Sequence, residues 1–380
     1  MSGSMMTSSG ADRPVPPREA ERGGDPGTGD IRRAIDRFLD WLARFGYTSY
    51  DQYDFWSTGF GRFARRLYYR RNWLGAPLVG PLVALDMVLP RSRMLVAKPV
   101  RFPIADAHFV TGFLRFFRCT GDEQWRARAQ EVEEALLESR ITGGSGAAWG
   151  YPFNWETAVG LFTRGTPLIT TTPYCYEACC MLFDVLGDER FRGAARSSVE
   201  FALHDLNPSP AATGATAWSY SPVDRSKVVN ANAYRAAMLA DAAVRFGRDD
   251  CREAAERSID FVLRSQRPDG SWPYEVESRH NDFVDNFHTC FVLKGLFRAW
   301  HILRNPAILG AIERGYAFYR AALLDADGLP KPFAVLPRTR TVHREMYDVA
   351  EGIALGVLLR DLFDDALPLA RRMAGFAIRM

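Results

Sequence analysis

A short polar stretch, Asp285-Asn286-Phe287-His288, places three side-chain types that handle protons and hydrogen bonds within four residues. It begins an apolar segment that predicts a helix over 285–303. Polar groups at a helix start meet free backbone N–H groups and the positive end of the helix dipole. An imidazole beside a carboxylate can act as a general base or acid, but an ordinary helix cap has the same composition, so both interpretations stay open.

Three aromatic arms of the form Trp-x-Tyr each precede an apolar helical segment. A flat indole or phenol face beside hydrogen-bonding groups is typical of a groove that binds a sugar, although a single arm is more often packing. Because three arms occur in similar positions, we expect them to contribute to a ligand groove. The arms are Trp149 and Tyr151, Trp218 and Tyr220, and Trp272 and Tyr274.

The spacing around these arms repeats along the chain. In the second and third arms, sixteen residues separate the tryptophan from an aligned side chain, Tyr234 or His288. His108, Tyr174 and Tyr234 each lie fourteen residues before the polar residue that joins their helix to the next one. We therefore predict that these four side chains lie at equivalent heights on successive inner helices and face one end of a common cavity.

The polar residues near these helix starts form the candidate site. Histidine, carboxylate and phenol groups transfer protons, while amides donate hydrogen bonds to ligand oxygens. The candidates for catalysis are His288, Asp285, Tyr234, Tyr347, His108 and Glu345. The candidates for substrate binding, besides the three arms, are Asn230, Asn232, Asn286, Tyr174 and Asp106.

Proton abstraction beside the carboxylate of a uronic acid is the reaction that this set favours. It gives C5 epimerisation or β-elimination and needs a base, an acid, and an asparagine or protonated carboxyl group to neutralise the carboxylate. Asparagine, histidine and tyrosine outnumber paired acids here. We expect His288 as base or acid, Asp285 orienting it, and Tyr234 or Tyr347 on the opposite side.

Two other reactions and a binding role remain open. Glycoside hydrolysis needs two carboxylates at a set separation. Isoprenoid cyclisation needs an aromatic cavity, and the segment Gln266-x-x-x-Gly270-x-Trp272 matches the QW repeat that ties helix ends together in squalene-cyclase-like toroids. The chain has no Asp-x-Asp-Asp motif to go with it. A glycan-binding protein without catalysis is the last alternative. The candidate carboxylates for hydrolysis are Asp106, Asp285, Glu345 and Asp348.

Helical hairpins should position these residues. From residue 104 onward, segments that are apolar almost all round alternate with amphipathic, charged segments, which predicts buried inner helices and exposed outer ones. Five pairs, with the N-terminal helices as a sixth, predict an all-α (α/α)6 toroid, a double ring of helical hairpins with aromatic loops at one end. An open α-solenoid is the alternative. The expected pairs are 104–119 with 123–139, 173–186 with 189–206, 230–246 with 250–265, 285–303 with 306–323, and 345–362 with 367–379.

Composition limits the remaining possibilities. The 380 residues are 47% hydrophobic, enough for a large core, and the net charge of +3 gives no reason to expect a nucleic-acid partner. Six cysteines show no metal-binding spacing, so we expect a reducing compartment, no metal and no cofactor. No apolar signal core is visible, which favours a cytoplasmic location. We divide the chain into a disordered tail (1–29), N-terminal helices (30–100) and the toroid (101–380).

The N-terminal region contains an unusual basic and apolar segment, 62–98. Five arginines between residues 62 and 71 alternate with aromatic residues, and an apolar stretch follows at 73–90. This stretch is short for a bilayer span and contains Pro77, Pro81 and Asp86. Basic and aromatic residues around an apolar segment suit peripheral contact with a cytoplasmic membrane surface. The alternative is a buried helical hairpin with a solvated basic rim.

Several sequence blocks carry a family resemblance. They are Tyr-Asp-Phe-Trp at 53–56, Arg-Leu-Tyr-Tyr-Arg-Arg at 66–71, Trp-Gly-Tyr-Pro-Phe-Asn-Trp at 149–155, Gly-Thr-Pro-Leu-Ile-Thr-Thr-Thr-Pro-Tyr at 165–174, Asn-Ala-Asn at 230–232, and Asp-Gly-Ser-Trp followed by Asp-Asn-Phe-His-Thr. Over residues 50–360 the chain resembles the VpsJ-like proteins of bacterial exopolysaccharide loci. The resemblance implies action on an envelope oligo- or polysaccharide, free or lipid-linked, in the cytoplasm or at the inner membrane face. The layout is more distantly similar to glucuronyl C5-epimerases and toroidal polysaccharide lyases.

Overall fold

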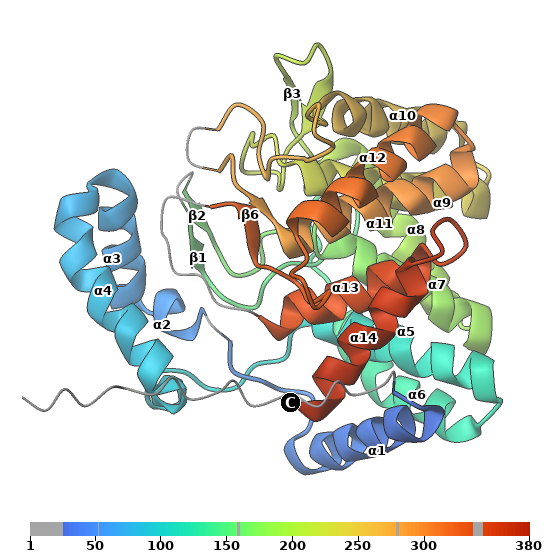
Figure 1. Cartoon of the computed structure of the whole chain (residues 1–380), viewed down its shortest axis with the longest axis horizontal. Helices are drawn as coiled ribbons and strands as arrows, with labels where there is room; N and C mark the ends of the chain where they lie inside the picture. The colour runs from blue at the N-terminus through green and yellow to red at the C-terminus, as the bar shows by residue number, and fades with distance from the viewer. Residues whose placement is uncertain (1–25, 52, 158–159, 279–280, 337–344) are drawn as a thin grey trace, which may run out of the picture.

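Alternating helices of the chain form two concentric layers (Figure 1). The computed structural model describes residues 26–51, 53–157, 160–278, 281–336 and 345–380. Each inner helix contacts its outer partner, and neighbouring inner helices contact one another. The inner and outer partners are α5 (Pro103–Thr120) and α6 (Glu123–Glu138), α7 (Thr172–Leu186) and α8 (Glu189–His204), α9 (Val229–Phe246) and α10 (Asp249–Arg264), α11 (Asn286–Leu303) and α12 (Pro306–Ala322), and α13 (Met346–Leu358) and α14 (Ala366–Arg379).

The hairpin turns follow from local sequence. Helices α5 and α7 end at Gly121 and Gly187, whose φ angles of 70° and 72° favour glycine. The next residue in each case, Asp122 or Asp188, accepts a hydrogen bond from a backbone N–H in the first turn of the outer helix. A left-handed glycine followed by an aspartate cap therefore reverses the chain within two residues. The predicted hairpins, and the all-α class, are confirmed.

The sixth side of the ring is built differently. Helix α1 (Thr28–Phe45) packs against α14, and the ring of Phe38 stacks on Phe109 of α5 with 6.1 Å between centroids. An apolar groove of about 690 Å³ remains between α1, α5, α13 and α14. The N-terminal helix thus belongs to the ring, but this side is more loosely filled than the others.

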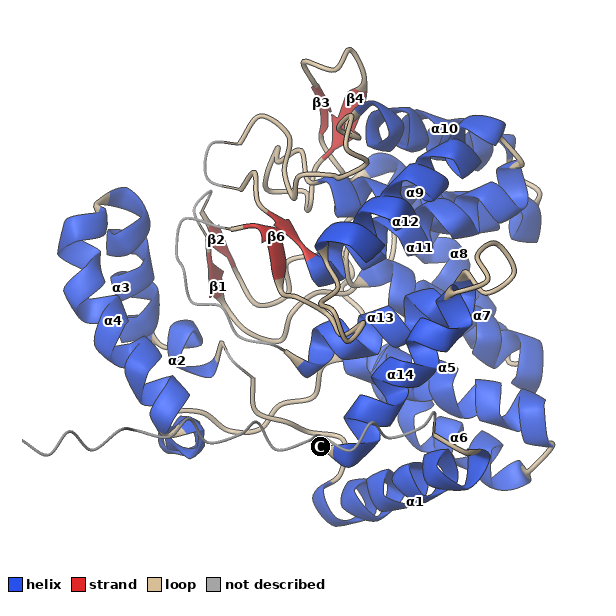
Figure 2. Ribbon diagram, viewed as in Figure 1, coloured by secondary structure: helices blue, strands red, loops and turns tan. Residues whose placement is uncertain are grey.

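Short antiparallel strands brace the loops at the end of the ring where the inner helices begin (Figure 2). The pairing of Val284 with Val335 attaches the loop after α12 to the start of α11. The described parts of these loops therefore cover this end of the ring. The strand pairs are β1 (Trp155–Glu156) with β2 (Leu161–Phe162), β3 (Pro208–Pro210) with β4 (Thr216–Trp218), and β5 (Val284–Asp285) with β6 (Phe333–Val335).

The QW-type segment ties helix ends together, as the sequence predicts. The amide of Gln266 donates to the carbonyl oxygens of Gly270 and Ala311, at 3.1 and 2.9 Å, and so links the end of α10 to α12. Trp272 lies directly on Gly315 of α12, where a side chain would meet the indole at 2.4 Å. The motif is architectural in this protein.

The basic and apolar segment forms a helical hairpin that stands beside the ring (Figure 1). It contains α2 (Asp54–Ser57), α3 (Gly59–Arg70), α4 (Asn72–Val88) and the 3-10 helix η1 (Pro90–Leu95). The alternative of a buried hairpin is wrong, because most of the apolar side chains of α4 and η1 are exposed or half-buried. No described helix is both long and apolar enough to cross a bilayer.

Candidate functional site

Aromatic side chains of four inner helices form a belt around the ring interior. The ring of His108 contacts that of Tyr174 in a tilted arrangement with 4.6 Å between ring centroids, and the hydroxyl groups of Tyr174 and Tyr234 lie 2.6 Å apart. Tyr234 in turn contacts Phe291 of α11 at 5.3 Å between ring centroids. His108, Tyr174 and Tyr234 lie at the same height along their helices, as the spacing predicts. The predicted level of His288 is wrong, because Phe291 is the residue of α11 that contacts Tyr234, and His288 lies one turn nearer the loops.

His288 and Asp285 are in direct contact at the start of α11. Nδ1 of His288 lies 2.6 Å from Oδ2 of Asp285, which is buried, and about a fifth of the histidine side chain is exposed. The contact arises because residues three apart in the first helical turn lie on the same side of the helix. Tyr274 and Phe287 enclose the imidazole, with centroid separations of 4.5 and 4.2 Å.

Asp348, at the start of the neighbouring helix α13, is the most strongly perturbed carboxyl group near this pair. Burial, followed by the negative charges of Asp285 and Glu345, raises the pKa of Asp348 to about 7. One oxygen of Asp348 and one of Asp285 are buried without a hydrogen-bond partner among the described residues. A carboxyl group with this pKa can hold or release a proton near neutral pH, which is the range in which acid–base catalysis operates.

Tyr347 of α13 lies against the aromatic residues that flank His288. Its ring lies 5.3 Å from that of Phe287 and 6.0 Å from that of Phe291, between ring centroids, and the residue is 40% exposed. Burial of the phenol raises the pKa of Tyr347, and the same holds for Tyr234. Both tyrosines therefore remain protonated at neutral pH and can donate a proton or a hydrogen bond.

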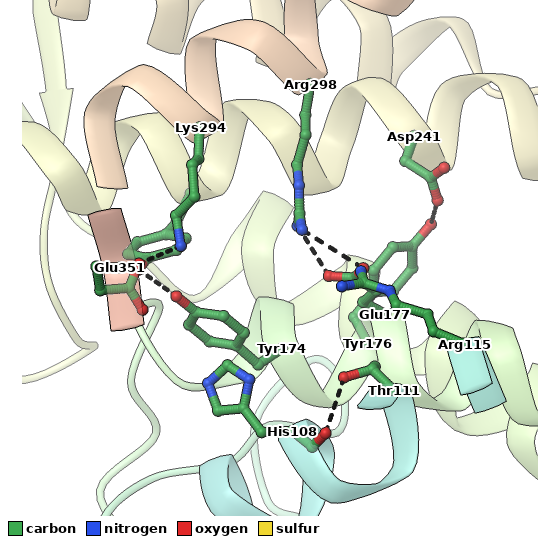
Figure 3. A network of polar contacts seen from close by, with 11 residues as sticks. His108, Thr111, Arg115, Tyr174, Tyr176, Glu177, Asp241, Lys294, Arg298 and Glu351 are labelled. Carbon is green, nitrogen blue, oxygen red and sulfur yellow. Dashed lines mark hydrogen bonds and ion pairs between the residues drawn. The ribbon is translucent and has the colours of Figure 1, made fainter. Parts of the chain in front are cut away.

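Deeper in the ring, charged side chains of the inner helices form a network that the sequence interpretation missed (Figure 3). Lys294 of α11 pairs with Glu351 of α13. Glu177 of α7 accepts from Arg115 at 2.6 Å and from Arg298 at 2.8 Å. Arg115, Glu177, Lys294 and Arg298 border a cavity of about 440 Å³ that extends from the tyrosine pair towards the opposite end of the ring.

Glu177 and Lys294 stay ionised despite their depth. Burial opposes ionisation of Glu177, but Arg298 and Arg115 lower its pKa. Burial also opposes the charge on Lys294, but Tyr174 and Glu351 raise its pKa. The available sequence signal was a cation at residues 294 and 298, one helical turn apart in an otherwise apolar helix.

His108 differs from His288 in its surroundings. It lines the inner end of the apolar groove, and desolvation followed by the charge of Lys294 lowers its pKa to about 4. His108 is therefore neutral over the physiological range. Both histidines reach the ring interior, one from α5 and one from α11.

The three tryptophans of the aromatic arms are buried and hydrogen-bonded to the backbone or covered by a cation. The indole N–H of Trp149 donates to the carbonyl of Leu136 at 2.8 Å, and that of Trp272 donates to Val262 at 2.9 Å. Trp218 lies under the guanidinium of Arg235, 4.1 Å from the ring centroid. Their faces are covered by protein, so we leave all three out of the proposed site.

The tyrosines of the same arms gather at the loop end. The hydroxyl of Tyr220 accepts a hydrogen bond from Thr170 at 2.7 Å, and Tyr151 stacks on Phe153 with 5.3 Å between centroids. Trp155 of β1 contacts both Tyr151 and Tyr220. Together with Tyr274, which lies against His288, these rings form an aromatic wall along the mouth of the ring.

Most of the predicted amide and acid ligands serve the scaffold. Asn232 exchanges hydrogen bonds with the backbone of Trp218, at 2.9 and 3.0 Å, and Asn286 donates to the carbonyl oxygens of Leu323 and Lys331. Asp106 is buried and paired with Arg101 at 2.9 Å, and burial raises its pKa to about 6. Asn230 is buried too, with its side-chain oxygen lacking a hydrogen-bond partner among the described residues. Glu345 is exposed at the end of the ring.

The metal-binding capacity of the described side chains and the polarity of the cavity also describe the site. No group of His, Cys, Asp and Glu side chains in the described ranges could hold a metal ion. Ion pairs border the cavity in the ring, whereas isoprenoid cyclisation requires a dry aromatic cavity. The apolar groove beside α1 lies outside this charged interior.

Comparison with known proteins supports the fold. The sequence matches no family model and no curated protein, so the resemblance to VpsJ-like proteins stays a prediction. Among solved structures, a GH76 α-mannanase of Bacteroides thetaiotaomicron gives a TM-score of 0.56 at 9% identity over 73% of each chain. An unsaturated glucuronyl hydrolase specific for heparin gives 0.55 at 14% identity over 74% of each chain.

A cellobiose 2-epimerase of Spirochaeta thermophila is also similar, with a TM-score of 0.51 at 14% identity over 74% of this chain and 73% of that chain. At these identities the likeness concerns the fold alone. The predicted (α/α)6 toroid is therefore confirmed, and the open solenoid is excluded. The chemistry must be argued from the side chains of this chain.

Proposed function

We propose that the protein is an enzyme that acts on a glycan and that His288 transfers the proton. The observation that carries this proposal is the 2.6 Å contact between Nδ1 of His288 and the buried carboxylate of Asp285. When the carboxyl group of Asp285 is ionised it only accepts hydrogen bonds, so the neutral imidazole then carries its proton on Nδ1 and has a free lone pair on Nε2. A half-buried imidazole in this state is a general base.

The reaction that best uses this arrangement is proton abstraction at C5 of a uronate residue. The C5–H bond breaks, its proton passes to Nε2 of His288, and the electron pair moves into the carboxyl group. In epimerisation a phenol, Tyr347 or Tyr234, returns a proton to the opposite face of C5. In β-elimination C5 is not protonated again. The electron pair forms a C4–C5 double bond, the C4–O bond breaks, and the leaving oxygen takes a proton from the phenol. Both phenols carry the proton that an acid must supply, because burial raises their pKa above its ordinary value.

The negative charge that develops on the substrate carboxyl group needs a donor. The sequence suggested asparagines, but Asn232 and Asn286 are bonded to the backbone. We assign the role to Asp348, whose pKa of about 7 keeps a proton available near neutral pH. A protonated Asp348 beside Asp285 also avoids two adjacent negative charges.

The substrate class is inferred from three sources. The tyrosine-rich wall supplies flat faces for sugar rings, the resemblance to exopolysaccharide-locus proteins suggests an envelope glycan, and the toroids of similar fold include two glycan hydrolases and a sugar epimerase. We therefore propose an oligo- or polysaccharide substrate, free or lipid-linked, that contains uronic acid.

Glycoside hydrolysis is the second candidate function. It is favoured by the electrostatic coupling of Asp285 and Asp348, since two buried carboxyl groups of which one stays protonated provide an acid and a base. In that case Asp348 would protonate the leaving oxygen, and His288 would orient Asp285.

Incubation of uronate-containing oligosaccharides in D₂O separates these reactions. Deuterium at C5 without chain cleavage indicates epimerisation, and an unsaturated product indicates elimination. Reducing ends with oxygen from solvent water and no deuterium at carbon would assign hydrolysis and overturn proton abstraction.

Substitutions at the dyad test the role of His288. We expect His288→Gln to lower kcat by about 10²–10⁴-fold, as for loss of a general base, and Asp285→Asn to lower it less. The matched control is His204→Gln on the outer helix α8, whose imidazole is exposed. Retention of full turnover by His288→Gln, with its fold intact by circular dichroism, would exclude a catalytic histidine.

A further inference from the structure

The hairpin of α3 and α4 packs mainly against itself. A Cβ atom on Gly75 would lie 2.3 Å from the backbone of Tyr68, so the two helices touch through their backbones. Contacts with the rest of the chain run through α2 and β1, where Arg66 forms two hydrogen bonds with Glu156 at 2.8 and 2.9 Å. The hairpin is therefore an attached outlying unit that leaves its outer faces uncovered (Figure 1).

The outer face of α4 is apolar from end to end. Trp73 is 73% exposed and Val88 is 76% exposed. Leu95 of η1 is 87% exposed, and Phe60 and Phe63 of α3 are also exposed. The exposed positions of α4 recur every three or four residues and include no charge. They are Trp73, Ala76, Pro77, Gly80, Pro81, Ala84, Leu85, Met87 and Val88.

Positive charge surrounds this apolar face. Residues 59–98 contain eight basic side chains and one acidic one, so the segment holds +7 of a chain whose net charge is +3 and leaves −4 on the remainder. The one acid, Asp86, is paired with Arg93 at 2.5 Å. Four exposed cations flank the apolar face at its two ends, and they are Arg70, Arg71, Arg91 and Lys98.

An apolar face rimmed by cations fits an anionic bilayer surface. The apolar side chains enter the boundary between headgroups and acyl chains, while the cations stay at the level of lipid phosphates. We propose that residues 59–98 dock the protein on a membrane that contains anionic phospholipid. This inference goes beyond the proposed reaction and does not depend on it.

The hairpin is suited to lie in the interface and not to span the bilayer. Helix α4 has 17 residues, which corresponds to about 25 Å, less than the hydrocarbon thickness of about 30 Å. Pro77 and Pro81 lack N–H groups, so carbonyl oxygens one turn earlier lack their helical donors. Such oxygens are costly in hydrocarbon and readily hydrated among headgroups.

Docking through the hairpin would also bring the candidate site close to the membrane. The hairpin lies on the side of the ring where the loops gather (Figure 1). Its partner strand β1 contains Trp155, which contacts the tyrosine wall. A substrate attached to a lipid could then enter the ring mouth from the headgroup layer.

The test is co-sedimentation of the full chain with two kinds of vesicle, phosphatidylcholine alone and phosphatidylcholine mixed with phosphatidylglycerol. We expect strong binding only to the mixed vesicles, weakened by salt, with a blue shift of tryptophan fluorescence. Trp73→Ser with Val88→Ser and Leu95→Ser should weaken the partition coefficient at least about tenfold. Glutamine at the four exposed cations should weaken it by about 100-fold or more.

Matched controls lie on the opposite parts of the surface. Val223→Ser and Val244→Ser remove exposed valines of the ring, and Arg126→Gln with Arg192→Gln remove exposed cations of outer helices. All should bind like the unchanged protein. Equal binding of the serine triple variant, or no binding of the unchanged protein, would overturn the proposal. The proposal would also be overturned if light scattering shows that the unchanged protein is a dimer without vesicle binding and that the triple variant is a monomer.

Discussion

At the scale of single residues, the side chains at the starts of α11 and α13 differ in how their surroundings affect their protons. His288 contacts the buried carboxyl group of Asp285, Tyr347 keeps its proton, and burial raises the pKa of Asp348 to about 7. The environment of each group, more than its type, sets these roles. The sequence supplied the residue types, but burial and neighbouring charge distinguish Asp348 from the other acids.

Asp348→Asn should remove an ionisation near pH 7 from the pH profile of kcat/KM. It should also change stability. Because the pKa of Asp348 is raised from 3.8 to about 7, the folded protein keeps a proton between these pH values that the unfolded chain has lost. The free energy of unfolding therefore falls as pH rises through this window.

Urea unfolding at pH 5 and pH 8 measures this effect. We expect the asparagine variant to lose less stability than the unchanged protein between the two pH values, by about 1–3 kcal/mol. Asp361→Asn, at an exposed carboxylate, should reproduce the unchanged protein. An identical pH dependence in both variants would mean that Asp348 ionises normally.

At the scale of helices and loops, the aromatic arms divide into two functions. Trp149 and Trp272 connect outer helices to the loops by buried N–H groups, and Trp218 lies under Arg235, whereas the tyrosines two residues later reach the ring mouth. The sequence could not predict which residue of each arm faces the core and which faces the ring mouth. Tryptophan and tyrosine both bind sugars and both fill cores. Contact with Gly315 and Val262 decides the case of Trp272.

Trp272→Ala should therefore act on stability. The substitution removes a buried indole and its hydrogen bond, and we expect a loss of about 3–5 kcal/mol in the free energy of unfolding. Trp73→Ala, at an exposed indole of the hairpin, should leave the unfolding midpoint in solution unchanged. A stable Trp272→Ala variant with only a raised KM would return this tryptophan to the binding site.

At the scale of the whole molecule, the ring is tight on one side and open on another. On α11, a Cβ atom at Gly295 would lie 2.9 Å from the carbonyl oxygen of Ala233 on α9. On α5, the same addition at Gly112 meets nothing within 4 Å, because that residue borders the apolar groove. Packing is therefore uneven around the axis.

Two glycine-to-alanine substitutions check this asymmetry. Gly112→Ala should raise the free energy of unfolding by about 0.5–1 kcal/mol, since alanine lowers the entropy of the unfolded chain and finds free space. Gly295→Ala should lower it, because the helices must move apart. Thermal unfolding of both variants gives the sign directly, and equal shifts would contradict the open groove between α13 and α5.

The sequence by itself determined the helical hairpins, their order and the level of His108, Tyr174 and Tyr234, because these follow from local periodicity, turn residues and constant spacing. Only the tertiary structure decided which charged side chains meet in the interior of the ring. Lys294, Glu351, Glu177 and Arg298 come from three different helices. Their pairing depends on how the helices pack around the ring, and the pKa of Asp348 depends first on burial and then on the carboxylate of Asp285, 63 positions away in the chain.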